Sequence, residues 1–181
     1  MPDPIDHLLD EHREIMGQIE ELRRAVRDLK ERGEVAVAES MPSLEAIGLM
    51  MGTRLLAHAR KEDQALFPAI EEALGHAGGP TAMMRREHRD IHAEAARFRE
   101  TLRELNEVEH PALVAGGAAL RRMTAGGAKA DELRETAEQI LRLLDLHFGK
   151  EEDILFPMAR EVLTPEALDQ VARKMEELAG G

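Results

Sequence analysis

The feature that most constrains this chain is an internal repeat of two sequence patterns. The segment His58–Pro68 returns as His147–Pro157, 89 residues further on, with six of its eleven residues identical. The pattern Glu-His-Arg at 11–13 returns at 87–89, an offset of 76 residues. Each half of the chain therefore carries a Glu-His-Arg segment followed by a His-x-x-x-Glu segment. A doubled two-helix unit of this kind is how a helical bundle builds a two-metal centre.

The composition predicts an all-α chain. Of its 181 residues, 43% are apolar, which is enough for one sizeable core. Ala, Leu, Glu and Arg dominate, so helix formers outnumber β-branched residues, and the aromatic residues are four Phe with no Trp or Tyr. We expect a single domain over residues 1–181. It should comprise a bundle at about 4–163 and an additional short C-terminal helix at about 165–178 that covers it.

Charge and cysteine content exclude several classes of function. The formal charge of −12, without a Lys/Arg run, argues against nucleic acid as a partner. With zero Cys the chain can form no disulfide and no thiolate metal site, so any metal must be bound by His and carboxylate. Its apolar runs all fall short of the roughly 18 residues that a membrane span needs. We therefore expect no membrane association and a cytoplasmic protein.

Apolar residues recur at helical spacing in five segments. Capping signals at Asp3-Pro4 and Thr164-Pro165 begin the first and the last of them. Residues 34–42 are left open between a loop and a first helical turn. Residues 106–130 are Gly-rich, and we expect a less regular crossover there with a short helix around Leu120 and Met123. The predicted helices span about 4–31, 43–75, 80–105, 131–163 and 165–178.

Pairs of histidine and carboxylate recur at a spacing of four residues. Residues i and i+4 lie on one face of a helix, with Cβ atoms roughly 5–6 Å apart, so both can point to one place in the core. Buried carboxylates without partners are costly, and metal cations remove that cost. The inward-facing residues, which we predict as metal ligands, are His12, His58, Glu62, His88, His92, His147 and Glu151.

The alternative for any single histidine is an ordinary core residue. The repeat outweighs this alternative, because independent core histidines have no reason to recur with the same neighbours in both halves. Three histidines have no counterpart in the repeat, and we interpret them as surface residues: His7, His76 and His110. The pattern Glu107-x-x-His110 occurs once, whereas ferritin-like carboxylate sites need it on two helices, so we exclude that class. We interpret the methionines at helical spacing as core residues.

This ligand order resembles the hemerythrin family, specifically the hemerythrin-like HHE cation-binding proteins. The match spans about residues 5–160, with His, His-x-x-x-Glu, His-x-x-x-His and His-x-x-x-Glu in that order. The resemblance implies a four-helix bundle around a non-haem di-iron centre bridged by an oxo or hydroxo group. One iron would be held by His88, His92 and His147, and the other by His12 and His58. Glu62 and Glu151 would bridge the two ions.

The resemblance leaves the second bridging carboxylate open between two residues. The invertebrate oxygen carriers place it five residues after the histidine, which is Glu152 here. We favour Glu151, because it corresponds to Glu62 in the repeat and because position i+5 turns away from the face shared at i+4.

Coordination numbers indicate what such a centre can do. Five imidazoles, two bridging carboxylates and one bridging oxygen fill eleven of about twelve positions on two six-coordinate ions. One position, on the iron with two histidines, stays open for O₂, peroxide or nitric oxide. Met16 stands where the other half has His92, so we predict that it lines this open position. The alternative is that Met16 only fills core volume.

Three classes of function fit these expectations. The first is a protein that binds or senses O₂ or nitric oxide. The second is a redox enzyme, either a peroxide-decomposing catalase or a relative of the iron–sulfur and nitrosative-stress repair proteins, which usually have a cysteine-bearing domain. The third is an iron-handling or structural bundle. Whether the chain is an enzyme, which protein partners it has and its oligomeric state are left open by the sequence.

Overall fold

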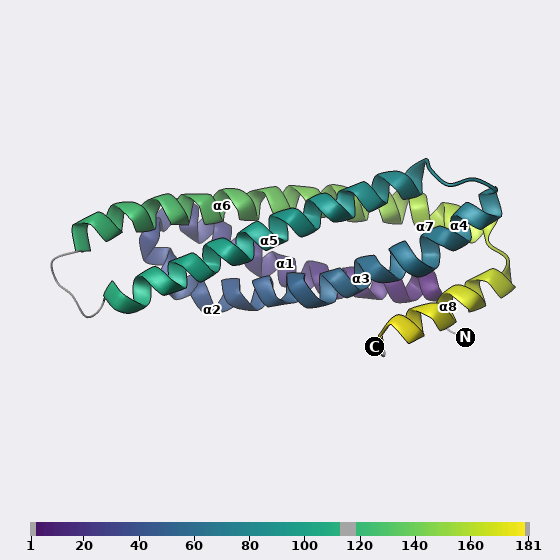
Figure 1. Ribbon diagram of the computed structural model, residues 1–181, viewed down its shortest axis with the longest axis horizontal. Helices are drawn as coiled ribbons and strands as arrows, with labels where there is room; N and C mark the ends of the chain where they lie inside the picture. Colours follow the sequence, from purple (N-terminus) through teal and green to yellow (C-terminus); the bar gives the residue numbers. More distant parts are fainter. Residues whose placement is uncertain (1–2, 113–118, 180–181) are drawn as a thin grey trace. The chain divides into compact units, whose positions relative to one another are not determined.

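The computed structural model describes the backbone of residues 3–112 and 119–179, with side chains for all of these except 34, 38, 106–112 and 119–128. Every regular element in this part of the chain is helical, which confirms the all-α prediction. In chain order (Figure 1) the elements are α1 (Pro4–Arg32), α2 (Glu34–Met50), η1 (Met51–Leu55), α3 (Leu56–Lys61), η2 (Glu62–Leu66), α4 (Phe67–Leu74), α5 (Pro80–Ala112), α6 (Ala119–Lys150), η3 (Glu151–Leu155), α7 (Phe156–Val162) and α8 (Pro165–Ala179).

The predicted starts of the first and last helices are confirmed by their capping contacts. The Asp3 carboxylate accepts a hydrogen bond from the backbone N–H of Ile5 at 2.8 Å, immediately before α1. The Thr164 hydroxyl accepts one from the backbone N–H of Ala167 at 3.3 Å, at the start of α8. Each cap is followed by a proline at the first helical position, where its missing N–H has no partner to lose.

The helices extend further than the sequence predicted. Residues 34–42 belong to α2, with Pro42 inside the helix. The irregular crossover predicted for 106–130 was wrong within the described residues, because α5 continues to Ala112 and α6 already begins at Ala119, before the predicted start near 131. Gly126 and Gly127 lie inside α6, although each glycine costs about 1 kcal/mol in a helix relative to alanine. Residues 113–118 of the predicted crossover lie outside the described residues.

Two compact units can be distinguished within the described chain. The first comprises 3–16, 53–92 and 143–179, and the second comprises 17–52 and 93–142. The first unit contains the start of α1, the segment from α3 to α4, the start of α5, and the segment from the end of α6 to α7, together with α8. All the predicted metal ligands belong to the first unit.

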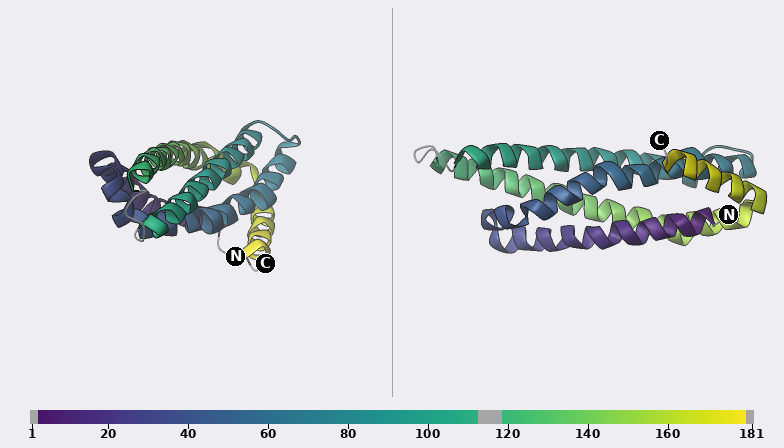
Figure 2. Two further views of the ribbon diagram at one scale, coloured as in Figure 1. Left: turned by 60° about the vertical axis from the view of Figure 1, so that its left-hand side comes forward. Right: turned by 90° about the horizontal axis from the view of Figure 1, so that it is seen from below.

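The core of the first unit explains the position of α8. Val171 and Met175 of α8 are buried in this core, and Leu168 and Leu178 pack against it, as the sequence predicted. Both views in Figure 2 show α8 near the start of α1, and α8 also packs against α3 and η2. The other buried core residues are Ile5, Leu8, Ala65, Leu66, Phe67, Ile70, Met84, Leu155, Phe156, Ala159 and Leu163.

The second unit has its own buried apolar residues on four helical segments. They come from the end of α1, from α2, from the end of α5 and from the start of α6. These residues include Ile19, Leu22, Leu44, Ile47, Phe98, Leu102, Leu133 and Ile140. None of the helices in the described part of the chain is long and apolar enough to cross a membrane.

A π-helical turn precedes Pro68, and another precedes Pro157. The turns η2 and η3 occupy equivalent places in the repeat and end just before Phe67-Pro68 and Phe156-Pro157. The N–H groups of Phe67 and Phe156 donate to the carbonyl five residues back, at Glu62 and Glu151. Proline crowds the carbonyl four residues before it, and a wider turn relieves that crowding.

Candidate metal centre

Six of the seven predicted ligands come together in the core of the first unit. Four helical segments supply them: α1, the segment α3–η2, α5, and the segment α6–η3. All six side chains are buried, with at most 3% of any residue exposed. They are His12, His58, Glu62, His88, His147 and Glu151.

These residues form two groups that share both glutamates. We call them the His12 group (His12, His58, Glu62, Glu151) and the His88 group (His88, His147, Glu62, Glu151), and in each group the potential ligand atoms lie within 4.8 Å of one another. We call Glu62 and Glu151 the central carboxylates. A carboxylate has two oxygens and can bind one ion with each, so this arrangement suits two adjoining cations.

The inward nitrogen of each histidine faces a central carboxylate. His147 Nε2 lies 3.0 Å from Glu151 Oε1, and His12 Nε2 lies 3.3 Å from Glu151 Oε2. His88 Nε2 lies 3.2 Å and His58 Nε2 lies 3.6 Å from Glu62 Oε2. The four Nε2 atoms therefore surround the two carboxylates.

The outward nitrogen of each histidine has a carboxylate of its own. We call these four residues the outer carboxylates, and each accepts a hydrogen bond from a histidine Nδ1–H. The outer carboxylate fixes the tautomer and the orientation of the ring, so the Nε2 lone pair points inward as a metal ligand requires. The pairs are His12 with Glu152 at 2.8 Å, His58 with Glu11 at 3.0 Å, His88 with Asp63 at 3.0 Å and His147 with Glu87 at 3.2 Å.

The interior of this cluster has acceptors in excess of donors. All four oxygens of the central carboxylates, and Nε2 of His88, are buried without a hydrogen-bond partner among the described residues. His12 Nε2 and His58 Nε2 lie 3.0 Å apart, so two neutral rings that each carry their proton on Nδ1 would bring two lone pairs together. Buried acceptors and carboxylates in this state are costly unless a cation binds between them. The residues present thus fit a bound pair of cations.

The titration of the cluster leads to the same conclusion. Burial opposes the charged imidazolium, but the hydrogen bond to Asp63 and the nearby negative charge of the central carboxylates prevail and raise the pKa of His88 to about 11. The pKa of His12 is also raised, because Glu151 and Glu62 outweigh its burial. Burial favours the neutral acid at Glu151, yet the surrounding histidines hold the pKa of its carboxyl well below the usual range. The central negative charge therefore calls for protons on the imidazoles or for metal cations.

The π-helical turns begin at the central carboxylates. Glu62 is the first residue of η2, and Glu151 is the first residue of η3. Each follows its histidine by four residues, with the histidine on the preceding α-helical turn. Glu151 is fully buried, whereas the side chain of Glu152 is 45% exposed. The geometry places Glu151 in the centre and gives Glu152 a different contact, to His12.

His92 and Met16, which correspond in the repeat, lie outside both groups. The His92 ring is half-buried, and its centroid lies 6.4 Å from that of His88. Met16 is also half-buried, on α1 one turn after His12. The fifth imidazole and the lining of the open position by Met16 stay predictions.

The three histidines assigned to the surface differ in their surroundings. His76 is exposed in the turn after α4, as predicted. The backbone of His110 is helical in α5 and not in a loop, so that part of the prediction was wrong, and its side chain is outside the described residues. The His7 side chain is 49% exposed on α1, but it also contacts Lys61 and Glu11.

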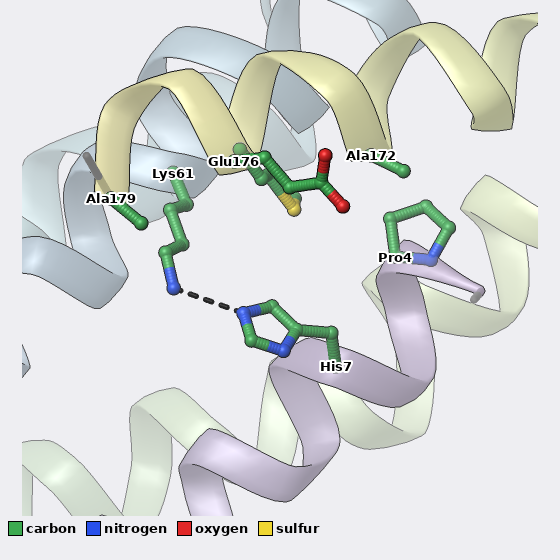
Figure 3. Close-up of a pocket in the computed structure, with 7 residues that line it drawn as sticks. Pro4, His7, Lys61, Ala172, Glu176 and Ala179 are labelled. Carbon is green, nitrogen blue, oxygen red and sulfur yellow. Dashed lines mark hydrogen bonds between the residues drawn. The ribbon is translucent and has the colours of Figure 1, made fainter. Parts of the chain in front are cut away.

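The buried Lys61 forms an ion pair with one of the outer carboxylates, Glu11. It is 6% exposed, and its ammonium lies 3.0 Å from His7 Nε2. Burial raises the pKa of Glu11, but His58 and Lys61 prevail and lower it to about 2. A cavity of about 180 Å³ is lined by His7, Lys61 and Glu176 of α8. Figure 3 shows Lys61 and His7 in contact on its wall.

The outer carboxylates and their lysines were missed from the sequence. Lys150 pairs with Glu87 just as Lys61 pairs with Glu11. All the residues concerned lie in the repeated patterns, directly before a histidine or beside a central carboxylate. Their recurrence at offsets of 76 and 89 residues was the available signal.

The fold and the site together define a class of protein: a helical bundle whose facing helices bring histidines and shared glutamates together in groups that could hold metal cations. The model of the hemerythrin HHE cation-binding domain matches residues 3–109 and 104–180. The chain belongs to this family, which confirms the resemblance drawn from its sequence. No curated protein and no solved structure matches the chain.

Proposed function

We propose that this chain is a non-haem di-iron protein that takes up O₂, peroxide or nitric oxide at an open coordination position, for binding or sensing. The observation that carries the proposal is the sharing of both central carboxylates by the two histidine groups. Imidazole and carboxylate together suit iron, and cysteine ligands are absent from the sequence. When bound, two iron ions joined by an oxo or hydroxo group would supply the redox chemistry.

The protein residues have separate tasks in this proposal. His12 and His58 would hold one iron, and His88 and His147 the other. The central carboxylates would balance charge and fix the separation of the ions. The outer carboxylates orient the imidazoles and increase their basicity.

The coordination number determines how many positions on the two ions would be left open for a small ligand. Four imidazoles, two bridging carboxylates and one bridging oxygen fill ten of about twelve positions, which leaves one position on each ion. If His92 adds a fifth imidazole, one position is left, on the ion held by His12 and His58. Either arrangement admits a diatomic ligand.

The arrangement without His92 also favours a second candidate function. With an open position on each ion, a peroxide can contact both ions at once, as in a di-iron enzyme that decomposes peroxide. The buried Lys61 is already paired with Glu11, and the sequence contains no Tyr or Trp. The decomposition of peroxide would therefore take place at the metal centre itself.

Iron content and the reaction with O₂ test the proposal. Elemental analysis and Mössbauer spectra of the purified protein should show about two iron ions per chain. In stopped-flow mixing with O₂, the reduced protein should change its spectrum and regain the original one when O₂ is removed. Rapid conversion to the oxidised form would favour the redox enzyme. A single zinc ion, or no reaction with O₂, would contradict the proposal.

A variant of Met16 tests which ion is open. The additional imidazole of Met16→His should bind if Met16 lines the open position, so both irons stay while azide affinity falls at least about tenfold. An unchanged azide spectrum with intact iron content would place the open position elsewhere.

A further inference from the structure

The four outer carboxylates are not held equally. Three of them are paired with a cationic side chain, and the pairing keeps a carboxylate ionised and in place beside its histidine. The three pairs are Glu11 with Lys61, Glu87 with Lys150 and Asp63 with Arg85. The lysine pairs are equivalent in the repeat, so His58 and His147 receive similar support. The outer carboxylates of His12 and His88, by contrast, differ in kind.

The outer carboxylate of His88 is fixed by an anchored arginine. Arg85 Nε lies 4.0 Å from Asp63 Oδ1, and a second guanidinium nitrogen donates to the Asp63 carbonyl at 3.5 Å. Arg85 is itself bound by Glu71 and lies 5.3 Å above the centre of the Phe67 ring. That ring stacks on His88, with centroids 5.8 Å apart and planes inclined by 11°. One connected set of contacts thus holds both the imidazole and its carboxylate.

The outer carboxylate of His12 lacks this arrangement. The repeat places Leu9 where Arg85 stands, and leucine carries no charge to bind Glu152. The Glu152 side chain is 45% exposed, so water competes for the oxygens that accept the His12 Nδ1–H. A carboxylate weakened by solvent polarises the imidazole less and makes Nε2 a weaker ligand.

Aromatic contacts position the His12 ring, but they do not replace the polarisation of the imidazole by its outer carboxylate. Phe148 stacks on His12 with centroids 4.1 Å apart, and Phe156 lies 5.3 Å away. These rings restrict the movement of the imidazole. Neither can accept the Nδ1–H as a carboxylate does, so the basicity of His12 depends on Glu152.

We propose that the two metal positions are unequal in lability, and that the position between His12 and His58 releases its ion first. The contrast between Leu9 and Arg85 sets this order through Glu152 and Asp63. These four are positioning residues, because they act on the metal through His12 and His88. The inference rests on the proposed two-metal function and adds the order in which the cations leave.

Release of cobalt to a chelator tests the inference without using any catalytic activity. The protein is loaded with Co²⁺ under argon and mixed with excess EDTA, and the visible Co²⁺ absorption is followed. Two phases of one cobalt each are expected, with rates at least about tenfold apart. Metal analysis after the first phase should find one cobalt per chain.

Matched variants assign the two phases. Glu152→Gln should accelerate the fast phase by about tenfold and leave the slow phase within twofold, in keeping with the effect of contacts beyond the ligands. Asp63→Asn should accelerate the slow phase by about 10–100-fold. Arg85→Leu, which reproduces the Leu9 arrangement in the second half, should also accelerate the slow phase. Circular dichroism of each metal-free variant checks that the helices persist.

Three outcomes overturn the inference. Two cobalt ions that leave in a single phase would contradict it while leaving the two-metal proposal intact. Acceleration of the slow phase by Glu152→Gln, with the fast phase unchanged, would reverse the assignment. Uptake of only one cobalt per chain would contradict the two-metal proposal itself, and the inference with it.

Discussion

The His12 group and the His88 group contain the same residue types at equivalent repeat positions, yet the residues around them have diverged. Both groups use two histidines and the same central carboxylates. The differences lie one turn away along α1 and α5, where Leu9 and Met16 stand in place of Arg85 and His92. A duplicated unit can thus keep the residues that face one another in the core, while the neighbouring positions, which tune the ligands of a bound metal, differ between its halves.

The largest expected effect comes from the residues that the two groups share. Glu151→Ala removes a ligand from both ions and leaves the other central carboxylate without its partner ions, so iron content should fall from about two per chain to well below one. His147→Ala should remove ligands from one ion only. Iron analysis and metal titration measure the difference.

Glu152→Ala is the matched control for Glu151→Ala. It removes an outer carboxylate and should retain more than half of the iron. If Glu152→Ala lost more iron than Glu151→Ala, the oxygen-carrier spacing would apply and Glu152 would be the bridge.

The two lysines offer a comparison of stability. Lys61→Met leaves the Glu11 carboxylate without its buried cation and should lower the free energy of unfolding by about 2 kcal/mol. Lys150 is 34% exposed, so Lys150→Met should cost less than about 1 kcal/mol. Urea titration of both metal-loaded variants tests this. An equal loss of unfolding free energy in the two variants would show that the burial of Lys61 adds nothing to stability.

A smaller effect is expected at the anchor of Arg85, and it depends on pH. Hydrogen bonds from Arg85 and Thr81 lower the pKa of the Glu71 carboxyl below its usual 4.5. The folded state therefore binds the proton less readily than the unfolded state, so this contribution to stability is present above pH 4.5 and is lost as the pH falls. Glu71→Gln should be less stable by about 1 kcal/mol at pH 7.

The pH dependence of that difference is the check on Glu71. The gap between Glu71→Gln and the unchanged protein should shrink steadily below pH 4.5 in urea titrations. In the repeat, the position that corresponds to Glu71 is occupied by Arg160, so the two halves of the chain differ at this place. A gap that stayed constant from pH 7 to pH 3 would show that the charge on Glu71 contributes nothing.

The smallest effect is expected at His92. Both groups are complete without it, so His92→Met should keep two metals per chain, with affinity changed less than about threefold. Isothermal titration with Co²⁺ compares it with His147→Met. A loss as large as that of His147→Met would make His92 a fifth ligand, as the sequence predicts.

Much of the fold and of the centre could be predicted, because the repeat and the i, i+4 spacing are constraints that the sequence carries directly. The placement of Glu151 rather than Glu152 followed from helix geometry. The length of α6 did not, because Gly126 and Gly127 have a low helix propensity and yet lie inside the helix. The outer carboxylates escaped notice because Glu11 and Glu87 look like ordinary surface acids until the folded chain brings them to a histidine on another helix.

His92 is the part of the ligand prediction that the packing of the helices leaves open. It stands four residues after His88, on the same face of α5, yet it belongs to neither group. Helical spacing brings a residue to a face, but the distance to ligands on the other helices depends on how those helices pack. Coordination of a metal by His92 therefore stays a prediction.

The central claim is that the repeat builds two cation positions that share Glu62 and Glu151. A crystal structure of the iron-loaded protein, with anomalous difference maps recorded on both sides of the iron absorption edge, tests this most directly. The account predicts two iron peaks per chain, one beside His12 and His58 and one beside His88 and His147, each in contact with both central carboxylates. A single peak, or two peaks without a shared carboxylate, would contradict it.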